Sequence, residues 1–433
     1  MKINWFSPIF PAATDIAHYT ARVLPALSEL TEITVWTTSS RWPKSLEKYG
    51  EVRRYGLDHL PAIDVNRADM TFYHIGNNPR FHWPIWHTSR VLPGVVVLHD
   101  FRLHHFFDWI YREHYQNLEM YLQMMAGIYG ESSLADASEC FKTNAANIDY
   151  MAERYPLTNL ALQNALGVIV HSNEAYDALR PGAEWPLMFA SLPFPAGELA
   201  KSIKSGPPYR IIVFGYLGRN RRLDSILEAI ASFAGQEKFC LDIFGSLLVD
   251  EEAIRAKIKK LNLTDSVAIH GFISEEKLET ALTESHLAIN LRFPTVGEAS
   301  GSQLRIWSHA LPSLVSDVGW YASLPADTVA FVRHDEHEVA DIRNHLADFL
   351  DAPDSFARMG VRGFEELKKD HSPAAYAKQI VTLAEEAQRF RPTFAARSLA
   401  KRAGVRLTEW LSPQDMDQPL RHVVSEALSI VKG

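Results

Sequence analysis

A histidine and an aspartate directly follow an apolar run in the first quarter of the chain. The run VVVL at 95–98 is typical of a buried strand, and His99 and Asp100 come immediately after it. Polar residues at the carboxyl end of a parallel strand lie at the edge where open α/β sheets bind ligands. The pair therefore predicts a functional site in which an imidazole and a carboxylate face a cleft.

Two more histidines, His104 and His105, come shortly after this pair. Together with His99 and Asp100 they supply residue types that bind zinc, so a metal site is one reading of the stretch. The other reading is that His104 and His105 pack on a helix, because histidines are frequent throughout this part of the chain.

A glycine turn with three arginines follows an apolar run in the second half of the chain. The segment FGYLGRNRR at 214–222 contains Gly215 and the arginines Arg219, Arg221 and Arg222. Glycine lets the backbone approach a ligand closely, and the forked guanidinium group suits phosphate. The segment is neither a P-loop nor a G-x-G-x-x-G motif, so it favours a diphosphate site without supporting a kinase or a dehydrogenase. A solvated basic helix start is the alternative.

The segment 290–305 combines a carboxylate with a predicted helix start. Glu298 lies on a loop after a strand, and Ser300, Gly301 and Ser302 open a helix whose free amides suit a phosphate. The alternative is that Ser300 or Ser302 only caps the helix. The next strand ends in Asp317, which places a further polar turn at the same edge.

Strand-length apolar runs alternate with longer amphipathic stretches, which is the pattern of parallel sheets covered by helices. In the first half, strands are predicted at 2–6, 32–37, 70–74, 94–98 and 167–171. In the second half, they are predicted at 210–214, 239–244, 267–270, 287–291 and 313–316. Residues 355–390 have a helical period.

Prolines and glycines cluster between Leu192 and Tyr209, where both periodicities are lost. The chain has 433 residues, which at roughly 100 to 200 residues per domain favours two domains. We expect one domain at 1–200, a second at 207–385 and a helical tail at 386–433. The predicted fold class is α/β, with two doubly wound Rossmann-like domains that face a central cleft.

Composition excludes several classes of protein. The chain carries 44 Lys and Arg against 52 Asp and Glu, a formal net charge of -8, so we expect no nucleic-acid partner. Its two cysteines, Cys140 and Cys240, are too few for a disulfide scaffold and fit a reducing compartment. Neither a signal peptide nor a membrane-length apolar run is found. We therefore expect a cytoplasmic protein, with a place on the inner membrane face left open.

The series of segments resembles the bacterial retaining glycosyltransferases of the GT-B fold, family 4. The resemblance covers roughly Met1 to Leu383 and depends on order and spacing rather than on one motif. The segments are Ser7–Pro11 with Ile16, Ala17 and Tyr19; Leu98–Asp100; Ile169–Ser172; Phe214–Arg222; and Glu298–Asp317. The resemblance implies transfer of a sugar from a nucleoside-diphosphate donor, bound by the second domain, to a glycan or lipid-linked acceptor on the first. Bacterial polysaccharide or lipopolysaccharide biosynthesis is the implied setting.

The resemblance also implies roles for individual residues. Glu298 would lie beside the donor sugar, Gly301 and Ser302 would offer amides to the diphosphate, and His99 would contact the sugar near its reacting carbon. No metal or other cofactor is expected, because preorganised cations and helix amides can stabilise the departing diphosphate.

The glycine turn corresponds to the family's phosphate loop. Gly215 would allow the diphosphate to approach, and one or more of Arg219, Arg221 and Arg222 would neutralise it. The register leaves the choice among the three arginines open.

Two residues depart from the family pattern. Arg305 stands near the place of a second glutamate that grips the donor's ribose, and arginine cannot accept a hydrogen bond from a hydroxyl. Either the donor is a deoxyribose nucleotide such as a dTDP-sugar, or the ribose is held otherwise. Asp15 replaces a loop glycine, so we expect an acceptor contact there, together with Tyr19 and Asp100.

The last segment is basic in an otherwise acidic chain. Six cations follow one another without an intervening acidic residue, and they are Arg389, Arg391, Arg397, Lys401, Arg402 and Arg406. They could face anionic lipid or a lipid-linked acceptor. The alternative is a solvated helix that crosses back to the first domain.

Two other functions remain open from the sequence. One is a sugar-nucleotide-binding protein without turnover that acts through a partner, which Arg305 and Asp15 suggest. The other is a sugar-nucleotide epimerase of the same fold. An enzyme that transfers sugar should release diphosphate, whereas a binding protein should only hold the donor.

Overall fold

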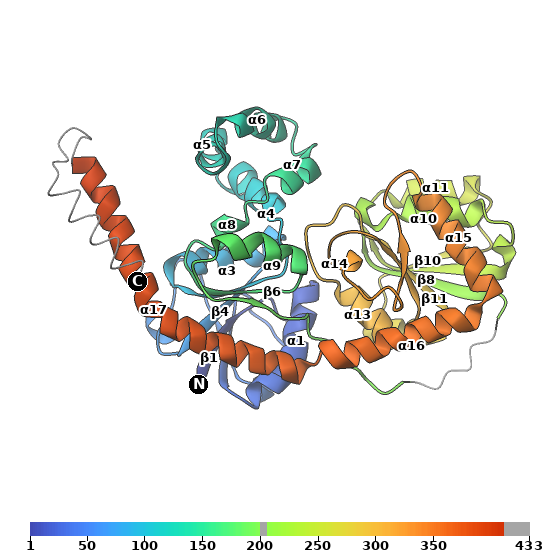
Figure 1. Ribbon diagram of the computed structural model, residues 1–433, viewed down its shortest axis with the longest axis horizontal. Coiled ribbons are helices and arrows are strands. Elements are labelled where there is room, and N and C mark those ends of the chain that lie inside the picture. Colours follow the sequence, from blue (N-terminus) through green and yellow to red (C-terminus); the bar gives the residue numbers. More distant parts are fainter. Residues whose placement is uncertain (200–205, 411–433) are drawn as a thin grey trace.

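The computed structural model describes residues 1–199 and 206–410, which form two α/β domains side by side. Each domain has a parallel sheet with helices on both faces, and a long C-terminal helix runs beneath the first domain (Figure 1). The predicted fold class is confirmed.

The sheet of the first domain has seven strands in the order β3-β2-β1-β4-β5-β6-β7, and all neighbouring pairs are parallel. The strands β4, β5 and β6 are buried along their whole length because helices cover both faces, as in β5, whose sequence is GVVVL. The strands are β1 (Lys2–Phe6), β2 (Glu32–Thr37), β3 (Glu51–Arg54), β4 (Met70–Ile75), β5 (Gly94–Leu98), β6 (Ala165–Val170) and β7 (Leu187–Phe189).

The helices of the first domain include an insertion between β5 and β6 that stands above the sheet (Figure 1). The covering helices are α1 (Asp15–Ser28), α2 (Ala62–Val65), α3 (Pro79–Val91) and α9 (Asn173–Leu179). The insertion holds α4 (His104–Trp109), a π-helical turn (Ile110–His114), α5 (Leu118–Tyr129), α6 (Leu134–Lys142), α7 (Ile148–Arg154) and α8 (Thr158–Ala161).

The second sheet has six parallel strands in the order β10-β9-β8-β11-β12-β13. They are β8 (Tyr209–Leu217), β9 (Phe239–Leu247), β10 (Val267–Gly271), β11 (Leu287–Asn290), β12 (Ser313–Ser316) and β13 (Ala330–Val332). The helices are α10 (Leu223–Ala231), α11 (Glu251–Lys260), α12 (Glu275–Glu284), α13 (Gly301–Ser308), α14 (Gly319–Ala322), α15 (Glu338–Asp351) and α16 (Pro353–Asp370).

The helix α17 (Pro373–Trp410) crosses back from the second domain to the first (Figure 1). Tyr376, Ile380 and Leu383 are buried in the core that also contains Trp5 of the first sheet. The apolar face of α17 thus completes the core of the first domain from Tyr376 onward, and the predicted boundary at 385 lies within this helix.

The two chain crossings between the domains run together. The Phe194 amide donates to the His371 carbonyl at 2.9 Å, and the His371 imidazole Nδ1 lies 2.7 Å from the Leu192 carbonyl. Phe194 belongs to the linker between β7 and β8, and His371 lies between α16 and α17. This pair of hydrogen bonds joins the two crossings to each other.

The basic stretch of α17 partly contacts the first domain. Arg391 donates to the Asp69 carbonyl at 3.2 Å, and Arg397 donates to the Glu184 carbonyl at 3.2 Å. These contacts fit the alternative of a helix that crosses back. Residues 411–433 of the predicted tail lie outside the described residues. No helix among the residues described is long and apolar enough to span a membrane.

Candidate functional site

In both sheets the strand order reverses beside the first strand, between β1 and β4 and between β8 and β11. Loops at the carboxyl ends of strands open at such a switch point, which is where doubly wound sheets bind ligands. The two sets of loops meet each other here. The Arg102 amide donates to the Val296 carbonyl at 2.7 Å, and the Ser172 hydroxyl donates to the Gly297 carbonyl at 2.9 Å.

Gly297 allows this close approach. Its φ is 79°, and a Cβ added there would lie 2.6 Å from the Cβ of Phe101 in the first domain. A side chain at this position would both strain the backbone and push the domains apart. The loop that carries Glu298 is therefore held against the first domain at the residue before it.

Glu298 has a defined orientation in this loop. Its Oε2 accepts hydrogen bonds from the Thr295 hydroxyl at 2.7 Å and the Val296 amide at 2.9 Å. Its Oε1 lies 3.4 Å from Nε of Arg292, and the side chain is only 14% exposed. Local hydrogen bonds and one guanidinium thus hold a carboxylate at the domain boundary.

Asp100 faces this carboxylate from the first domain. Its Oδ2 accepts a hydrogen bond from the Asn77 amide at 2.6 Å. Burial, and then the negative charge of Glu298, raise its pKa to about 7. The structure therefore brings together Asp100 and Glu298, two candidate residues that are nearly 200 positions apart.

His99 lies in a group of aromatic and imidazole rings. Its Nε2 is 3.0 Å from Nδ1 of His74, and its ring packs edge-on against Tyr19 with centroids 4.8 Å apart. Burial, followed by the neighbouring His74 and His171, lowers the pKa of His99 well below the ordinary value. A neutral imidazole therefore stands at the end of β5.

Tyr19, predicted to lie on the acceptor side, is buried beneath these rings. It is 3% exposed, and its hydroxyl lies 2.6 Å from the hydroxyl of Tyr376 on α17. This position lies in the core under the site rather than on an open surface, because α17 covers α1. An acceptor contact would require the side chain to be uncovered.

The three arginines of the glycine turn have three different surroundings. Arg221 is buried and donates to the Asn290 side chain and the Phe214 carbonyl, each at 2.8 Å. Arg222 has a left-handed backbone, with φ of 56°, and pairs with Glu338 at 2.9 Å. Among the described residues none forms a hydrogen bond or ion pair with the side chain of Arg219, which is exposed.

Gly215 lies against this arginine cluster. Its φ is 115°, and an added Cβ would come 2.9 Å from Nη2 of Arg221 and 4.0 Å from the Ser302 hydroxyl. The end of β8 and the start of α13 therefore border one small space. This is the arrangement expected for backbone approach to a diphosphate.

Ser300 is the N-cap of α13, and its hydroxyl accepts a hydrogen bond from the Gln303 amide at 3.1 Å. This is the capping role that the sequence offered as the alternative for Ser300. In the described part of the chain, the amides of Gly301 and Ser302 have no hydrogen-bond partner. Unpaired first-turn amides at a helix N-terminus favour an anion.

Arg292 is a site residue that the motif analysis passed over. It is the second residue after β11, and its Nε lies 3.4 Å from Oε1 of Glu298. Burial acts to lower its pKa, but Tyr321 and Glu298 raise it above the ordinary value. The sequence signal was present, because Arg292 lies in the segment that carries Glu298.

Arg305 is turned toward α12 rather than toward a free space. It pairs with Glu275 and lies 3.9 Å from Glu279, which also holds His309 at 2.9 Å. The residue that stands in place of a ribose-binding glutamate therefore has carboxylates around it.

Asp15 is the first residue of α1 and faces the second domain. Burial lowers the pKa of Arg221 to about 10, and the negative charge of Asp15 acts in the opposite direction there, as it does at Arg292. The adjacent Ala13 carbonyl accepts a hydrogen bond from the Tyr216 hydroxyl at 3.1 Å. Asp15 thus lies opposite the arginines of the second domain.

The four residues of the metal reading do not converge. His104 is buried, with its two ring nitrogens 2.6 Å from the Tyr155 carbonyl and 2.7 Å from the Tyr121 hydroxyl. This agrees with the other reading, in which His104 packs on a helix. His105 lies 3.3 Å from a carboxylate oxygen of Asp149. Within residues 1–199 and 206–410, the group of potential metal ligands close enough to share an ion is Asp335, Glu336 and His337, all exposed.

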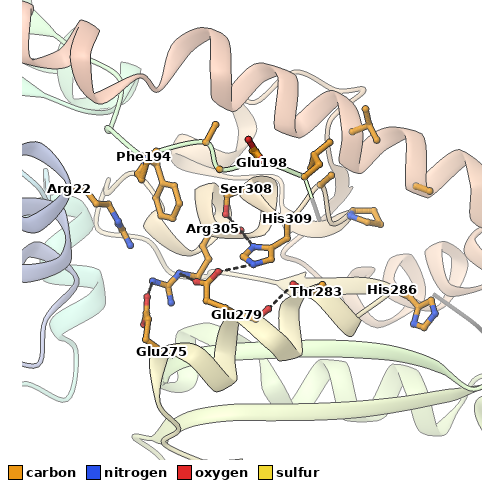
Figure 2. Close-up of a pocket in the computed structure, with 18 of the residues that line it drawn as sticks. Arg22, Phe194, Glu198, Glu275, Glu279, Thr283, His286, Arg305, Ser308 and His309 are labelled. Carbon is orange, nitrogen blue, oxygen red and sulfur yellow. Dashed lines mark hydrogen bonds and ion pairs between the residues drawn. The ribbon is translucent and has the colours of Figure 1, made fainter. Parts of the chain in front are cut away.

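A cavity of about 1400 Å³ lies beside this site, under the linker (Figure 2). Arg22 of α1, Phe194 of the linker and Arg305 of α13 border it at the end near the domain boundary. Glu275 and Glu279 of α12 form the opposite wall.

Comparison with known proteins supports the architecture. No protein-family model and no curated protein sequence match the chain. HepE of Anabaena, solved in complex with UDP, has a TM-score of 0.58 at 13% identity and covers 88% of this chain and 99% of its own. A sucrose-phosphate synthase from Thermosynechococcus elongatus has a TM-score of 0.59 at 14% identity, with coverages of 92% and 100%.

WaaG, a glycosyltransferase involved in lipopolysaccharide biosynthesis, has a TM-score of 0.54 at 12% identity and covers 88% of this chain and 98% of its own. Structural similarity at such low sequence identity is evidence for the fold alone. The chain has the GT-B arrangement of two Rossmann-like domains.

Proposed function

We propose that this protein is a retaining, metal-independent glycosyltransferase of the family 4 type. It moves a sugar from a nucleoside-diphosphate donor to a glycan or lipid-linked acceptor. The proposal places the enzyme at the cytoplasmic side of bacterial polysaccharide or lipopolysaccharide biosynthesis.

The observation that carries the proposal is the position of Glu298 at the boundary between the domains. The loop that carries Glu298 is hydrogen-bonded to the first domain through the carbonyls of Val296 and Gly297. Burial, and then the charge of Glu298, raise the pKa of Asp100 on the other side of this boundary. His99 directly follows β5 and precedes Asp100, and the amides of Gly301 and Ser302, which have no hydrogen-bond partner among the described residues, open α13 shortly after Glu298. A donor with its sugar near Glu298 and its diphosphate at α13 would use all of these groups.

The proposed reaction breaks the bond between the sugar's anomeric carbon and the diphosphate oxygen. Negative charge then builds on the leaving group, where the α13 amides and the arginines Arg219, Arg221 and Arg292 stabilise it. The acceptor oxygen forms the new bond from the same face. Its proton passes to the leaving phosphate oxygen, so no metal and no external base is needed.

The fixed carboxylate of Glu298 would stabilise positive charge on the sugar as the bond breaks. Its two hydrogen bonds and its contact with Arg292 keep it oriented before the donor arrives. His99 is neutral and hydrogen-bonded to His74, which suits a role in holding sugar hydroxyls rather than in carrying charge.

A uridine nucleotide is the first donor class to test, because HepE was solved with UDP and with UDP-glucose. The deoxyribose alternative remains in the panel. The other possibility was that the donor's ribose is held by residues other than position 305. Glu275 and Glu279 of α12 lie beside Arg305, and we propose that their carboxylates hold the ribose hydroxyls.

The decisive experiment is donor turnover. UDP-, dTDP- and GDP-sugars are incubated with the protein, with and without acceptor glycans and with a chelator present. The release of the nucleoside diphosphate is measured. The proposal expects diphosphate release that persists with the chelator, and a product that keeps the donor's anomeric configuration. Tight binding without release would favour the binding protein, and conversion of the donor without release would favour the epimerase.

Contact with an anionic membrane through α17 is part of the proposal. Arg389, Lys401 and Arg402 are exposed there, whereas Arg391 and Arg397 already bond the first domain. Co-sedimentation with vesicles containing phosphatidylglycerol should occur at low salt and fall with added salt, because the attraction is electrostatic. Absence of binding at low salt would remove this part alone.

A further inference from the structure

Arg22 is a largely buried cation without an anionic partner. It extends from α1 toward the cavity end described above (Figure 2). Within the described residues its guanidinium forms no hydrogen bond and no ion pair, and it lies over the Phe194 ring, 4.0 Å from the centroid. A buried charge normally has such a partner, because removing it from water is costly.

The electrostatics of Arg22 reflect this lack of compensation. Burial, and then the positive charge of Arg305, lower its pKa to about 10. Asp15, Glu275 and Glu279 act in the opposite direction, but none lies within ion-pair distance of it. The guanidinium remains charged at neutral pH in surroundings that would gain from an added anion.

Arg22 also marks the point where three parts of the molecule meet. It belongs to α1 of the first domain and lies on Phe194 of the linker between β7 and β8. Its Nη1 is 3.9 Å from the position that a Cβ on Gly301 would take, at the first residue of α13 in the second domain. The unpaired amides of Gly301 and Ser302 are thus next to the unpaired guanidinium.

A phosphoryl group suits these donors. Two adjacent amides at a helix N-terminus and a nearby guanidinium fork together offer several hydrogen-bond donors, and phosphate offers several acceptor oxygens. Arg305 is already engaged by Glu275, which leaves Arg22 as the guanidinium free to pair at this end of the cavity.

We infer that Arg22 binds the phosphoryl group of the donor nucleotide and completes the diphosphate site from the first domain. This inference rests on the proposed function, because it assumes that a nucleotide lies at the start of α13. The second domain supplies the amides, and the first supplies the cation. The full phosphate site therefore exists only when the domains meet as they do in this structure.

The test compares Arg22→Met with Arg90→Met in the full-length protein. Methionine keeps an apolar stem on Phe194 but removes the charge. Arg90 is a matched control, since it also lies on an aromatic ring, Trp86 at 5.0 Å, but in the last turn of α3, away from the cleft edge. Calorimetry measures the affinity of each protein for UDP, inorganic pyrophosphate and uridine.

Loss of one charge-assisted contact should weaken UDP and pyrophosphate binding by roughly 10- to 100-fold in the Arg22 variant. Uridine affinity and the melting temperature without ligand should stay as in the wild type and in the control. Unchanged UDP and pyrophosphate affinity would overturn the inference. Equal weakening of uridine would also overturn it, because it would indicate a structural role.

The two proposals fail separately. If the wild type turns over a sugar nucleotide while Arg22→Met binds UDP normally, only the inference fails. If UDP binds in a phosphate- and Arg22-dependent way but no donor is turned over, only the proposed function fails. A wild type that binds neither UDP nor pyrophosphate would overturn the inference directly.

Discussion

Replacement of Asp100 by asparagine should change the pH dependence of stability in a defined direction. In the folded protein, burial and the charge of Glu298 raise the pKa of Asp100 from 3.8 to about 7. Asparagine keeps an oxygen that can accept from the Asn77 amide but carries no charge at any pH. The variant therefore isolates the cost of ionising this carboxyl group between the domains.

The sign follows from the two protonation states. Below about pH 4 the carboxyl group is protonated whether the chain is folded or unfolded, so its stabilising effect is fully present. As the pH rises through 7, the folded protein must also ionise it, and that stability is lost. The difference between 3.8 and about 7 corresponds to at most about 4 kcal/mol, at roughly 1.36 kcal/mol per pH unit.

Urea unfolding of the wild type and Asp100→Asn at a series of pH values measures this effect. The free energy of unfolding of the variant minus that of the wild type should rise by up to about 4 kcal/mol from pH 4 to pH 8, mostly below pH 7. Differences between two variants cancel the titration of other groups.

The same comparison in a Glu298→Gln background separates the effect of burial from that of the Glu298 charge. There the rise in the free-energy difference between the proteins with Asn and with Asp at position 100 should be smaller, because the neighbouring charge is removed while burial remains. A difference in the free energy of unfolding between the wild type and Asp100→Asn that does not vary with pH would refute the reasoning. An equal rise with and without the Glu298 charge would show that the two carboxyl groups do not meet.

Two further predictions concern the domain contact and the nucleotide. Gly297→Ala should lower turnover strongly and destabilise by about 1–3 kcal/mol, since the added Cβ would lie 2.6 Å from Phe101. Gly130→Ala is the control, with a similar φ of 81° and open space around it, and normal turnover in Gly297→Ala would contradict the contact. In a thermal-shift screen of UDP, GDP, dTDP, ADP and CMP, one diphosphate at 100 times its dissociation constant should stabilise by roughly 2.7 kcal/mol. A melting temperature unchanged by every nucleotide would count against a donor site.

Most of the sheet architecture could be predicted from the sequence. The predicted strands at 2–6, 32–37, 94–98 and 313–316 match β1, β2, β5 and β12 residue for residue. Inner strands of a parallel sheet are buried on both faces, so they form continuous apolar runs that are easily found. The other predicted strands differ only at their ends, as in β8, which extends to Leu217.

Three of the four edge strands, β3, β7 and β13, could not be found in this way, whereas the fourth, β10, was predicted at 267–270. The sequence of β3 is EVRR, and β7 and β13 have only three residues each. An edge strand is covered less and paired on one side, so neither length nor apolar content distinguishes it from a loop. Helical period alone likewise does not show that α17 packs into the core of the first domain.

The candidate site was predicted in its motifs but not in its pairings. That His99, Asp100 and Glu298 lie at strand ends follows from the apolar runs before them. That Asp100 faces Glu298, and that Arg22 reaches Gly301, depends on how two separate domains are placed. Arg222 and Arg305 show the same limit, since their partners Glu338 and Glu275 come from helices remote in sequence.

The central claim is that the fixed carboxylate of Glu298 takes part in sugar transfer. Its most direct test measures the release of nucleoside diphosphate from the preferred sugar nucleotide. The test compares the wild type, Glu298→Ala and the control Glu365→Ala, in which an exposed glutamate is replaced. The account predicts release by the wild type and the control, and loss of release in Glu298→Ala with UDP affinity and melting temperature largely kept. Near-normal release by Glu298→Ala would contradict the account.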